Sequence, residues 1–341
     1  MPVASSEQFE AMLDAAGARG FAFPAVNVSS SETLNAALRG FADAGSDGIV
    51  QITTGRAAFL SGSRVQDMAA GAEAFACFAR TVAAQCPVLI GLHTDHCPSD
   101  QLDAFVSPLL ERSRARRGNS EPPLFNSHMF DGSTLALEDN LSIAAELLHQ
   151  CRDVGAVLEV ECGAVGGEED GLACPAGRSD LYTTTDDLLR VADALGTGSR
   201  GRYLLAATFG NAHGALPPGS VDLRPSILQD GQAALAVAHP GARFDYVFHG
   251  GSGSAAAEFS EAISYGVVKI NMDTDLQYAF SRAVAGHMFE HYDGVLRLDG
   301  GTGDKKAFDP RSWGRRAEEA MARRVAELCR QFGSAGRSLL G

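Results

Sequence analysis

The residues that carry the densest chemistry in this sequence are His93-Thr94-Asp95-His96-Cys97, which follow the apolar run 88–92. That run is typical of a short buried strand. Its end carries a carboxylate, two imidazoles and a thiol, which are groups that bind metal ions and transfer protons. Taken alone, these residues fit equally well a strand end at which Asp95 caps the next helix. The ends of the other predicted strands decide between the two interpretations.

Polar or ionisable side chains end nearly every predicted strand. The strands are predicted at 21–28, 48–53, 88–95, 123–131, 156–161, 203–209, 244–249 and 267–273. The residues at or just past their ends are Asn27, Thr53, Asp95, His96, Asp131, Glu161, Asn211, His213, His249, Asn271 and Asp273. Because each buried polar group costs free energy unless it is paired, a full ring of them indicates a functional site.

The elements that position these residues alternate between strand and helix, which indicates parallel strands with right-handed crossovers. Eight such units close a (β/α)8 TIM barrel, whose active site lies at the carboxyl ends of the strands. We therefore expect a single α/β barrel domain over residues 1–341, with an extra N-terminal helix over 5–18 and a C-terminal helical extension over 274–291 and 310–332. Helices are also expected over about 65–85 and from Pro98 onward. A doubly wound open sheet is the alternative, but it needs a Gly-rich turn after the first strand.

The composition excludes several classes of protein. A net charge of -14 argues against binding to nucleic acid and to anionic membranes. The seven cysteines are an odd number without C-x-x-C spacing, which predicts reduced thiols and a cytoplasmic protein. Residues 1–20 contain no apolar core of a signal peptide, and no run is apolar enough to cross a membrane.

Three histidines from three strand ends, His96, His213 and His249, match the ligand set of a catalytic zinc site with an open position. Imidazole nitrogens favour Zn²⁺ over Mg²⁺, which prefers oxygen ligands. Asp131 and Glu161 are candidates for the oxygen ligands of a second or alternative metal position.

Two further segments indicate a phosphate pocket and a lid. Gly250, Gly251 and Ser252 precede a predicted helix after the seventh strand, where barrels often bind phosphate, and 271–274 forms the opposite lip. The Gly- and acid-rich loop 163–180 leaves the fifth strand above the proposed metal and is expected to be a mobile lid with a general base. A metal beside a phosphate pocket suits aldol cleavage, in which the ion polarises a ketone and stabilises an enediolate.

A set of motifs spread over the chain resembles class II fructose-1,6-bisphosphate aldolase. The motifs are FPAVN at 23–27, LHTDHC at 92–97, SHMFDGS at 127–133, GGEEDG at 166–171, FGNAHG at 209–214, HGGSGS at 249–254, KINMDTD at 269–275 and DPRSW at 309–313. The resemblance implies a zinc-dependent lyase of glycolysis and gluconeogenesis. Such an enzyme splits fructose 1,6-bisphosphate into dihydroxyacetone phosphate and glyceraldehyde 3-phosphate through a zinc-stabilised enediolate.

The resemblance also implies roles for individual residues. Asp95 is similar to the acid/base that serves the aldehyde and the C4 hydroxyl, and Glu169 to the lid residue that moves the dihydroxyacetone phosphate proton. Substrate contacts are implied for Asn27, Thr53, Gly214, Gly250, Gly251, Ser252, Asn271, Asp273, Thr274 and Arg311. Arg311 reaches the second phosphate from a neighbouring subunit in this family, which implies a homodimer or homotetramer. A monovalent cation, Na⁺ or K⁺, near the phosphate is also implied.

Several alternatives stay open. At 53–57 the chain reads Thr-Thr-Gly-Arg-Ala, and Arg56 stands where the family has glycine. Lys269 has the strand parity to point into the barrel, so a Schiff-base aldolase is one rival. A barrel metallohydrolase is a second rival, and a non-catalytic metal- or sugar-phosphate-binding protein is a third. Within the family, tagatose or sedoheptulose bisphosphate is an alternative substrate.

Overall fold

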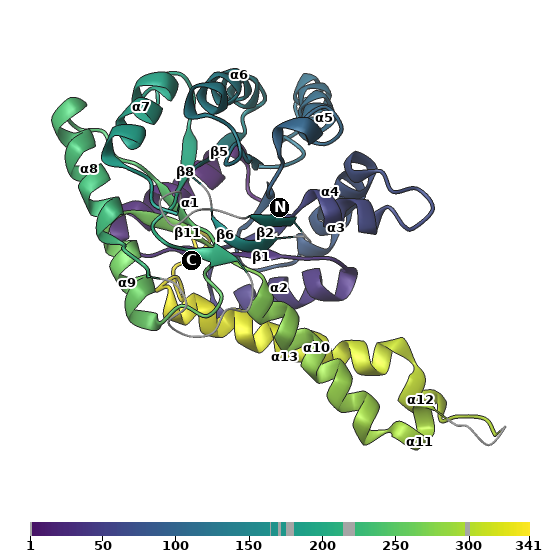
Figure 1. Ribbon diagram of the computed structural model, residues 1–341. Coiled ribbons are helices and arrows are strands. Elements are labelled where there is room, and N and C mark those ends of the chain that lie inside the picture. The colour runs from purple at the N-terminus through teal and green to yellow at the C-terminus, as the bar shows by residue number, and fades with distance from the viewer. Residues whose placement is uncertain (1, 164, 170–171, 175–180, 214–221, 297–300) are drawn as a thin grey trace.

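The computed structural model describes residues 2–163, 165–169, 172–174, 181–213, 222–296 and 301–341. Its centre is a closed barrel of parallel strands in the order β1-β11-β10-β8-β5-β4-β3-β2 (Figure 1). The barrel strands are β1 (Phe23–Asn27), β2 (Gly48–Ile52), β3 (Ile90–Thr94), β4 (Ser127–Phe130), β5 (Val157–Cys162), β8 (Tyr203–Ala207), β10 (Tyr246–Phe248) and β11 (Val267–Met272). The predicted TIM barrel is therefore confirmed, and the polar strand ends share one rim.

Helices surround the barrel and cover its outer face (Figure 1). They are α2 (Ser31–Ala44), α4 (Met68–Ala83), α5 (Val106–Gly118), α6 (Leu137–Val154), α7 (Thr185–Leu195), α8 (Ser226–Ala238) and α9 (Ala256–Ser264). Helix α2 shows how the sequence sets the two ends of such a helix. Ser30 caps its start, and Gly45 ends it in the left-handed region at φ 58°. Its buried stripe includes Leu34, Leu38 and Phe41, as the helical spacing predicts.

The amino-terminal end of the barrel is closed by α1 (Ser6–Arg19). Its buried Phe9, Met12 and Leu13 belong to one apolar cluster with side chains from the lower barrel interior. The barrel residues of that cluster are Phe23, Ala25, Ile49, Leu89, Val157, Leu204, Ala206, Val247 and Val268. The predicted N-terminal helix is thus a plug for the end of the barrel opposite the polar rim.

The chain after β11 forms a helical arm. Helices α10 (Thr274–Glu290) and α13 (Pro310–Gln331) run side by side away from the barrel, with α11 (Tyr292–Val295) and α12 (Lys305–Phe308) at the far end (Figure 1). The inner part of α13 also packs against α2. The predicted C-terminal helical extension is confirmed. In the described part of the chain, no helix combines the length and the apolar character that a membrane span requires.

The helix predicted over 65–85 is α4, which begins after its cap Asp67. One short helix was not predicted and another prediction was wrong. The unpredicted helix is α3 (Thr54–Leu60), which Thr53 caps directly after β2. The helix expected from Pro98 is a single 3-10 turn, η1 (Ser99–Gln101), before α5 begins at Val106.

The predicted loop over 163–180 contains strands in its described part. Strand β6 (Gly166–Glu169) pairs antiparallel with β7 (Leu172–Cys174) and parallel with β9 (Ala212–His213). All three strands are short, and β6 consists of glycine and glutamate alone, so the sequence lacks the apolar alternation that marks a strand. Residues 164, 170–171 and 175–180 of the predicted lid lie outside the described residues.

Candidate active site

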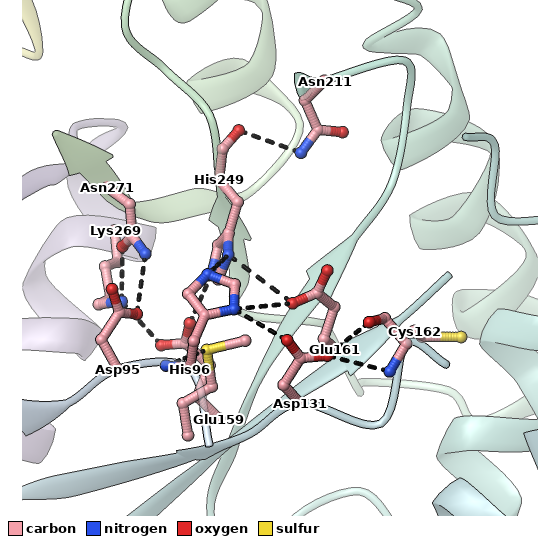
Figure 2. A network of polar contacts seen from close by, with 12 residues as sticks. Asp95, His96, Asp131, Glu159, Glu161, Cys162, Asn211, His249, Lys269 and Asn271 are labelled. Carbon is pink, nitrogen blue, oxygen red and sulfur yellow. Dashed lines mark hydrogen bonds and ion pairs between the residues drawn. The ribbon is translucent and has the colours of Figure 1, made fainter. Parts of the chain in front are cut away.

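The upper half of the barrel interior holds a network of buried polar groups (Figure 2). At its centre, His96 Nε2 and His249 Nδ1 lie 3.0 Å apart, with the two rings edge to face. His96 follows β3 and His249 follows β10, so the barrel brings together two histidines that are 153 residues apart. The backbone of His96 has φ 29°, which is an unusual value for a residue with a side chain. Such strain is typical of functional sites, where the surrounding structure holds a side chain in place.

Each of these histidines has a carboxylate on its outer nitrogen. Asp131 Oδ2 lies 3.0 Å from His96 Nδ1, and Glu159 Oε1 lies 2.7 Å from His249 Nε2. Asp131 is itself fixed, because its Oδ1 accepts hydrogen bonds from the backbone and hydroxyl of Ser133. Carboxylates in this position orient metal-binding imidazoles and set their tautomer. The two inner nitrogens therefore face one another as a preorganised pair.

Glu161 lies beside the same pair. Its Oε2 is 3.6 Å from His96 Nδ1 and 3.9 Å from His249 Nδ1, and it is buried without a hydrogen-bond partner among the described residues. Burial, followed by the negative charge of Asp131, raises the pKa of Glu161 well above its usual value. A cation that binds beside Glu161 would stabilise its ionised form and lower this pKa.

The electrostatics of the histidine pair also favour a cation. Burial lowers the pKa of His96, but Asp95 and the hydrogen bond to Asp131 outweigh it and raise that pKa well above 6.5. Burial lowers the pKa of His249, which favours the neutral imidazole that binds metals. Asp95, His96 and His249 form one cluster with metal-ligand spacing, and His96, Asp131 and Glu161 form another. The donor set therefore fits a divalent ion, with imidazole nitrogens that suit zinc.

Glu159 is the most important site residue that the sequence analysis missed. It is fully buried, and its Oε2 lies 2.9 Å from Lys269 Nζ and 3.4 Å from His93 Nε2. Burial opposes its ionisation, but the charges of Lys269 and His93 hold the pKa of Glu159 well below its usual value. Its strand parity with Glu161 is the signal that would have found it, because alternate residues of a strand share a face.

Lys269 points into the barrel, as its position on alternate residues of the strand predicts, and its amine contacts two side chains there. Its Nζ donates to Asn271 Oδ1 at 2.7 Å and is paired with Glu159, and its side chain is fully buried. It therefore supports the carboxylate under His249. A Schiff-base nucleophile needs a neutral amine, whereas this amine lies in an ion pair.

The buried carboxylate of Asp95 accepts hydrogen bonds from three side-chain amides. Its Oδ2 accepts hydrogen bonds from Asn27 and Gln51, each at 2.9 Å, and its Oδ1 accepts one from Asn271 at 3.1 Å. Burial raises the pKa of Asp95, but the charges of His96 and Lys269 hold it well below its usual range. Asp95 is thus an ionised acceptor next to the histidine pair. Gln51 was absent from the predicted ring because it lies inside β2 rather than at its end.

The turn after β10 has the backbone that its glycines predict. Gly250 has φ 64°, and a Cβ on it would lie 2.4 Å from the Ala212 carbonyl oxygen. The hydroxyl of Ser252 accepts a hydrogen bond from the backbone of Asp275 at 3.3 Å, which joins this turn to the start of α10. The turn therefore lies next to Asn271, Asp273 and Thr274 on the rim, where the sequence analysis expects two lips of a phosphate pocket, and the binding role of these residues stays a prediction.

The remaining predicted site residues have different outcomes. His213 and Gly167 are paired in the register of β9 with β6, so the described backbone of Glu169 lies two residues beyond that pair. The roles of the His213 and Glu169 side chains stay predictions, and Gly214 lies outside the described residues. Arg311 is the second residue of α13, the helix that together with α10 forms the helical arm. Thr53 caps α3 through the backbone of Arg56, at 3.3 Å.

The known proteins to which this chain is similar are fructose-bisphosphate aldolases. A protein-family model for fructose-bisphosphate aldolase class-II matches residues 7–337. The fructose-bisphosphate aldolase of Streptomyces galbus is 55% identical over 340 residues, which cover 99% of this chain and 100% of that protein. That of Mycobacterium leprae is 53% identical over 343 residues, covering 99% of each chain. The crystal structure of the Campylobacter jejuni fructose-bisphosphate aldolase is 33% identical, with a TM-score of 0.85, and covers 98% of this chain and 97% of its own.

Proposed function

The chain belongs to the class II fructose-bisphosphate aldolase family, and on that basis we propose that His96, His213 and His249 hold its divalent metal ion. The enzyme is a lyase that cleaves fructose 1,6-bisphosphate into dihydroxyacetone phosphate and glyceraldehyde 3-phosphate. The observation that carries the metal assignment is the convergence of His96 Nε2 and His249 Nδ1 to 3.0 Å, with a carboxylate on each outer nitrogen. When bound, the ion supplies Lewis-acid chemistry to the ketone carbonyl.

We assign zinc to this site because its nearest donors are imidazole nitrogens. Asp131 orients His96 and, together with Glu161, offers the oxygen ligands of a second divalent position. These two assignments are compatible, because each carboxylate oxygen has two lone pairs, so Asp131 can bind a cation while its oxygens contact His96 and Ser133.

Two carboxylates share the proton transfers. Asp95 exchanges a proton with the C4 hydroxyl, which becomes the aldehyde oxygen on cleavage. Its position one residue before His96 and its cluster with His96 and His249 support this role. Glu169 moves the proton on the carbon next to the ketone, and this role is supported by the pairing of Gly167, two residues earlier in β6, with His213 of β9. General acid–base catalysis of this kind contributes roughly 10²–10⁴-fold to the rate.

The ketone-side phosphate of the substrate binds at the lip after β10 and β11. The left-handed Gly250 and the link from Ser252 to α10 support an anion site of backbone N–H groups. Gly214, Gly251, Asn271, Asp273 and Thr274 complete the ketose contacts, and a monovalent cation, Na⁺ or K⁺, accompanies the phosphate.

A homodimer or homotetramer completes the site. The Arg311 side chain is 83% exposed and forms an ion pair with Asp309 at 2.6 Å on the helical arm. Phe289 and Tyr278 on α10 of the same arm are 80% and 62% exposed, which supports burial of this arm against another copy. Arg311 then reaches a phosphate in the neighbouring subunit's site.

The enzyme works in the cytoplasm, where glycolysis and gluconeogenesis take place. Cys97 and Cys151 are both buried and unpaired, as expected for a protein of a reducing compartment. Burial raises the pKa of each thiol to about 12, which keeps both in the unreactive thiol form.

The metal assignment is tested by fructose 1,6-bisphosphate cleavage with EDTA, with zinc added back, and with borohydride in the presence of dihydroxyacetone phosphate. We expect EDTA to abolish cleavage, zinc to restore it and borohydride to have no effect. Activity that survives EDTA and is lost with borohydride would instead assign the chemistry to Lys269.

A further inference from the structure

Arg56 brings a guanidinium group to a rim that is otherwise rich in carboxylates. It is the third residue of α3, directly after β2, and its Nη2 lies 2.6 Å from Asp273 Oδ2. Asp273 follows β11, and β1 lies between β2 and β11 in the barrel. The arginine side chain therefore crosses the end of β1 to meet its partner. The two side chains are 10% and 19% exposed, so the pair is mostly buried and a small part of each side chain is open at the rim.

A purely structural role explains this ion pair poorly. A mostly buried ion pair is weak evidence of stabilisation, because desolvation of the two charges offsets their attraction, and a long arginine side chain loses rotamer freedom when it is held in one geometry. The pair also lies on the same rim as the groups that the proposed function assigns to substrate binding. A sugar bisphosphate carries two dianionic groups, and a guanidinium binds such oxygens in a bidentate manner better than any other side chain does.

The order of the strand ends indicates which phosphate Arg56 meets. This step rests on the proposed function, which puts the ketone-side phosphate after β10 and β11, the carbonyl near His96 and His249, and the C4 hydroxyl near Asp95, which follows β3. The substrate therefore extends from the β10 side toward β3. Arg56 stands just past the end of β2, the neighbour of β3, and its side chain reaches over β1 to Asp273, so it spans the region between the two phosphates. The ketone-side phosphate already has the backbone donors of the lip after β10, whereas the cation proposed for the aldehyde-side phosphate, beyond the C4 hydroxyl, comes from the neighbouring subunit. The aldehyde-side phosphate is therefore the one for which Arg56 supplies what the rest of the subunit lacks.

We propose that Arg56 is a specificity-determining residue that binds the aldehyde-side phosphate of the substrate from within the same subunit. Asp273 positions the guanidinium, and Asp273 is itself fixed by Gln277, whose Nε2 donates to Oδ1 at 2.8 Å. When the bisphosphate binds, the fork of the guanidinium is shared between Asp273 and the phosphate oxygens. Arg56 thereby adds an internal cation to the Arg311 of the neighbouring subunit.

The test uses partial reactions of the zinc-loaded enzyme. Arg56→Ala removes the group, Arg56→Lys keeps the charge without the fork, and Arg64→Ala removes an exposed arginine further along the same βα connection as a matched control. The readouts are kcat and KM for fructose 1,6-bisphosphate and deuterium exchange into dihydroxyacetone phosphate alone. A third readout is the preference for glyceraldehyde 3-phosphate over glyceraldehyde in condensation.

We expect Arg56→Ala to raise KM for the bisphosphate and lower the preference for the phosphorylated aldehyde, each by about 10- to 100-fold. Exchange into dihydroxyacetone phosphate should stay within twofold of wild type, Arg56→Lys should recover part of the loss, and Arg64→Ala should behave as wild type. An unchanged KM, or an equal loss in exchange, would overturn the role of Arg56 at this phosphate. The proposed metal site is judged separately, because it requires that EDTA abolish the exchange in the wild-type enzyme.

Discussion

The two halves of the barrel interior are built on the same strands and have opposite chemistry. The lower half is lined by apolar side chains such as Phe23, Ile49 and Leu204, which pack against α1. The upper half is lined by buried polar and charged side chains. They include Asn27, Gln51, His93, Asp95, Glu159, Glu161, His249, Lys269 and Asn271. Single strands carry both kinds, since Ile49 and Gln51 on β2 point inward two residues apart.

This difference separates what folds the protein from what the protein does. Burial of apolar surface stabilises the lower half by about 25 cal/mol per Å². In the upper half the desolvation of each charge opposes folding, and pairing offsets that cost without a reliable net gain. A polar upper half is therefore retained for its chemistry, and substitutions in the two halves should separate activity from stability.

The largest expected effect comes from Asp95→Asn in the upper half. The amide keeps the shape of the side chain, and Asn27 and Gln51 can turn their own oxygens toward it. The change removes the proposed acid/base, so kcat for cleavage should fall by roughly 10²–10⁴-fold. The free energy of unfolding should decrease, because the folded protein favours the ionised carboxylate, as its lowered pKa indicates. Steady-state kinetics and urea denaturation test both expectations, with zinc content as the control. A variant that keeps kcat within tenfold would remove Asp95 from the proton transfers.

The second effect is expected from Lys269→Met, which leaves Glu159 buried without its cation. Removal of one partner of a buried ion pair destabilises by roughly 3–5 kcal/mol. Because Glu159 also orients His249, zinc affinity should fall by about 10–100-fold. Urea denaturation and competition with a zinc chelator measure the two effects.

The matched control for this prediction is the double variant Lys269→Met, Glu159→Gln. It removes both charges of the pair, so the unfolding free energy should recover most of the loss seen in the single variant. Zinc affinity should stay low, because the carboxylate under His249 is absent. A double variant as unstable as the single one would mean that Lys269 acts by packing alone.

The fold and the rim could be read from the sequence because both depend on local patterns. Short apolar strands alternate with amphipathic helices, and polar residues such as Asp95 and Asn271 end the strands. The convergence of His96 and His249 then follows from barrel closure, which brings the strand ends to one rim. The arm that carries Arg311 was predicted as helices, but its direction depends on the packing of α13 against α10 and α2.

What the sequence did not reveal depends on contacts between distant segments. The carboxylate of Glu159 could have been found from its parity with Glu161, but its partners lie on other strands, at His93, His249 and Lys269. Strand β6, which is rich in glycine and glutamate, pairs with β9, which lies more than 40 residues later in the chain. Neither pairing leaves a periodic signal in one short segment.

The smallest effect, and the sharpest test of the comparison, is expected from Ile49→Val in the lower half. The side chain is fully buried, and loss of one methylene group should lower the unfolding free energy by about 0.5–1.5 kcal/mol. kcat and zinc affinity should match the wild type, although Gln51, two residues further along β2, contacts Asp95. In the double variant with Asp95→Asn, the unfolding free energies should add within about 0.5 kcal/mol if the halves are independent. A larger coupling would show that packing in the lower half sets the position of the groups above it.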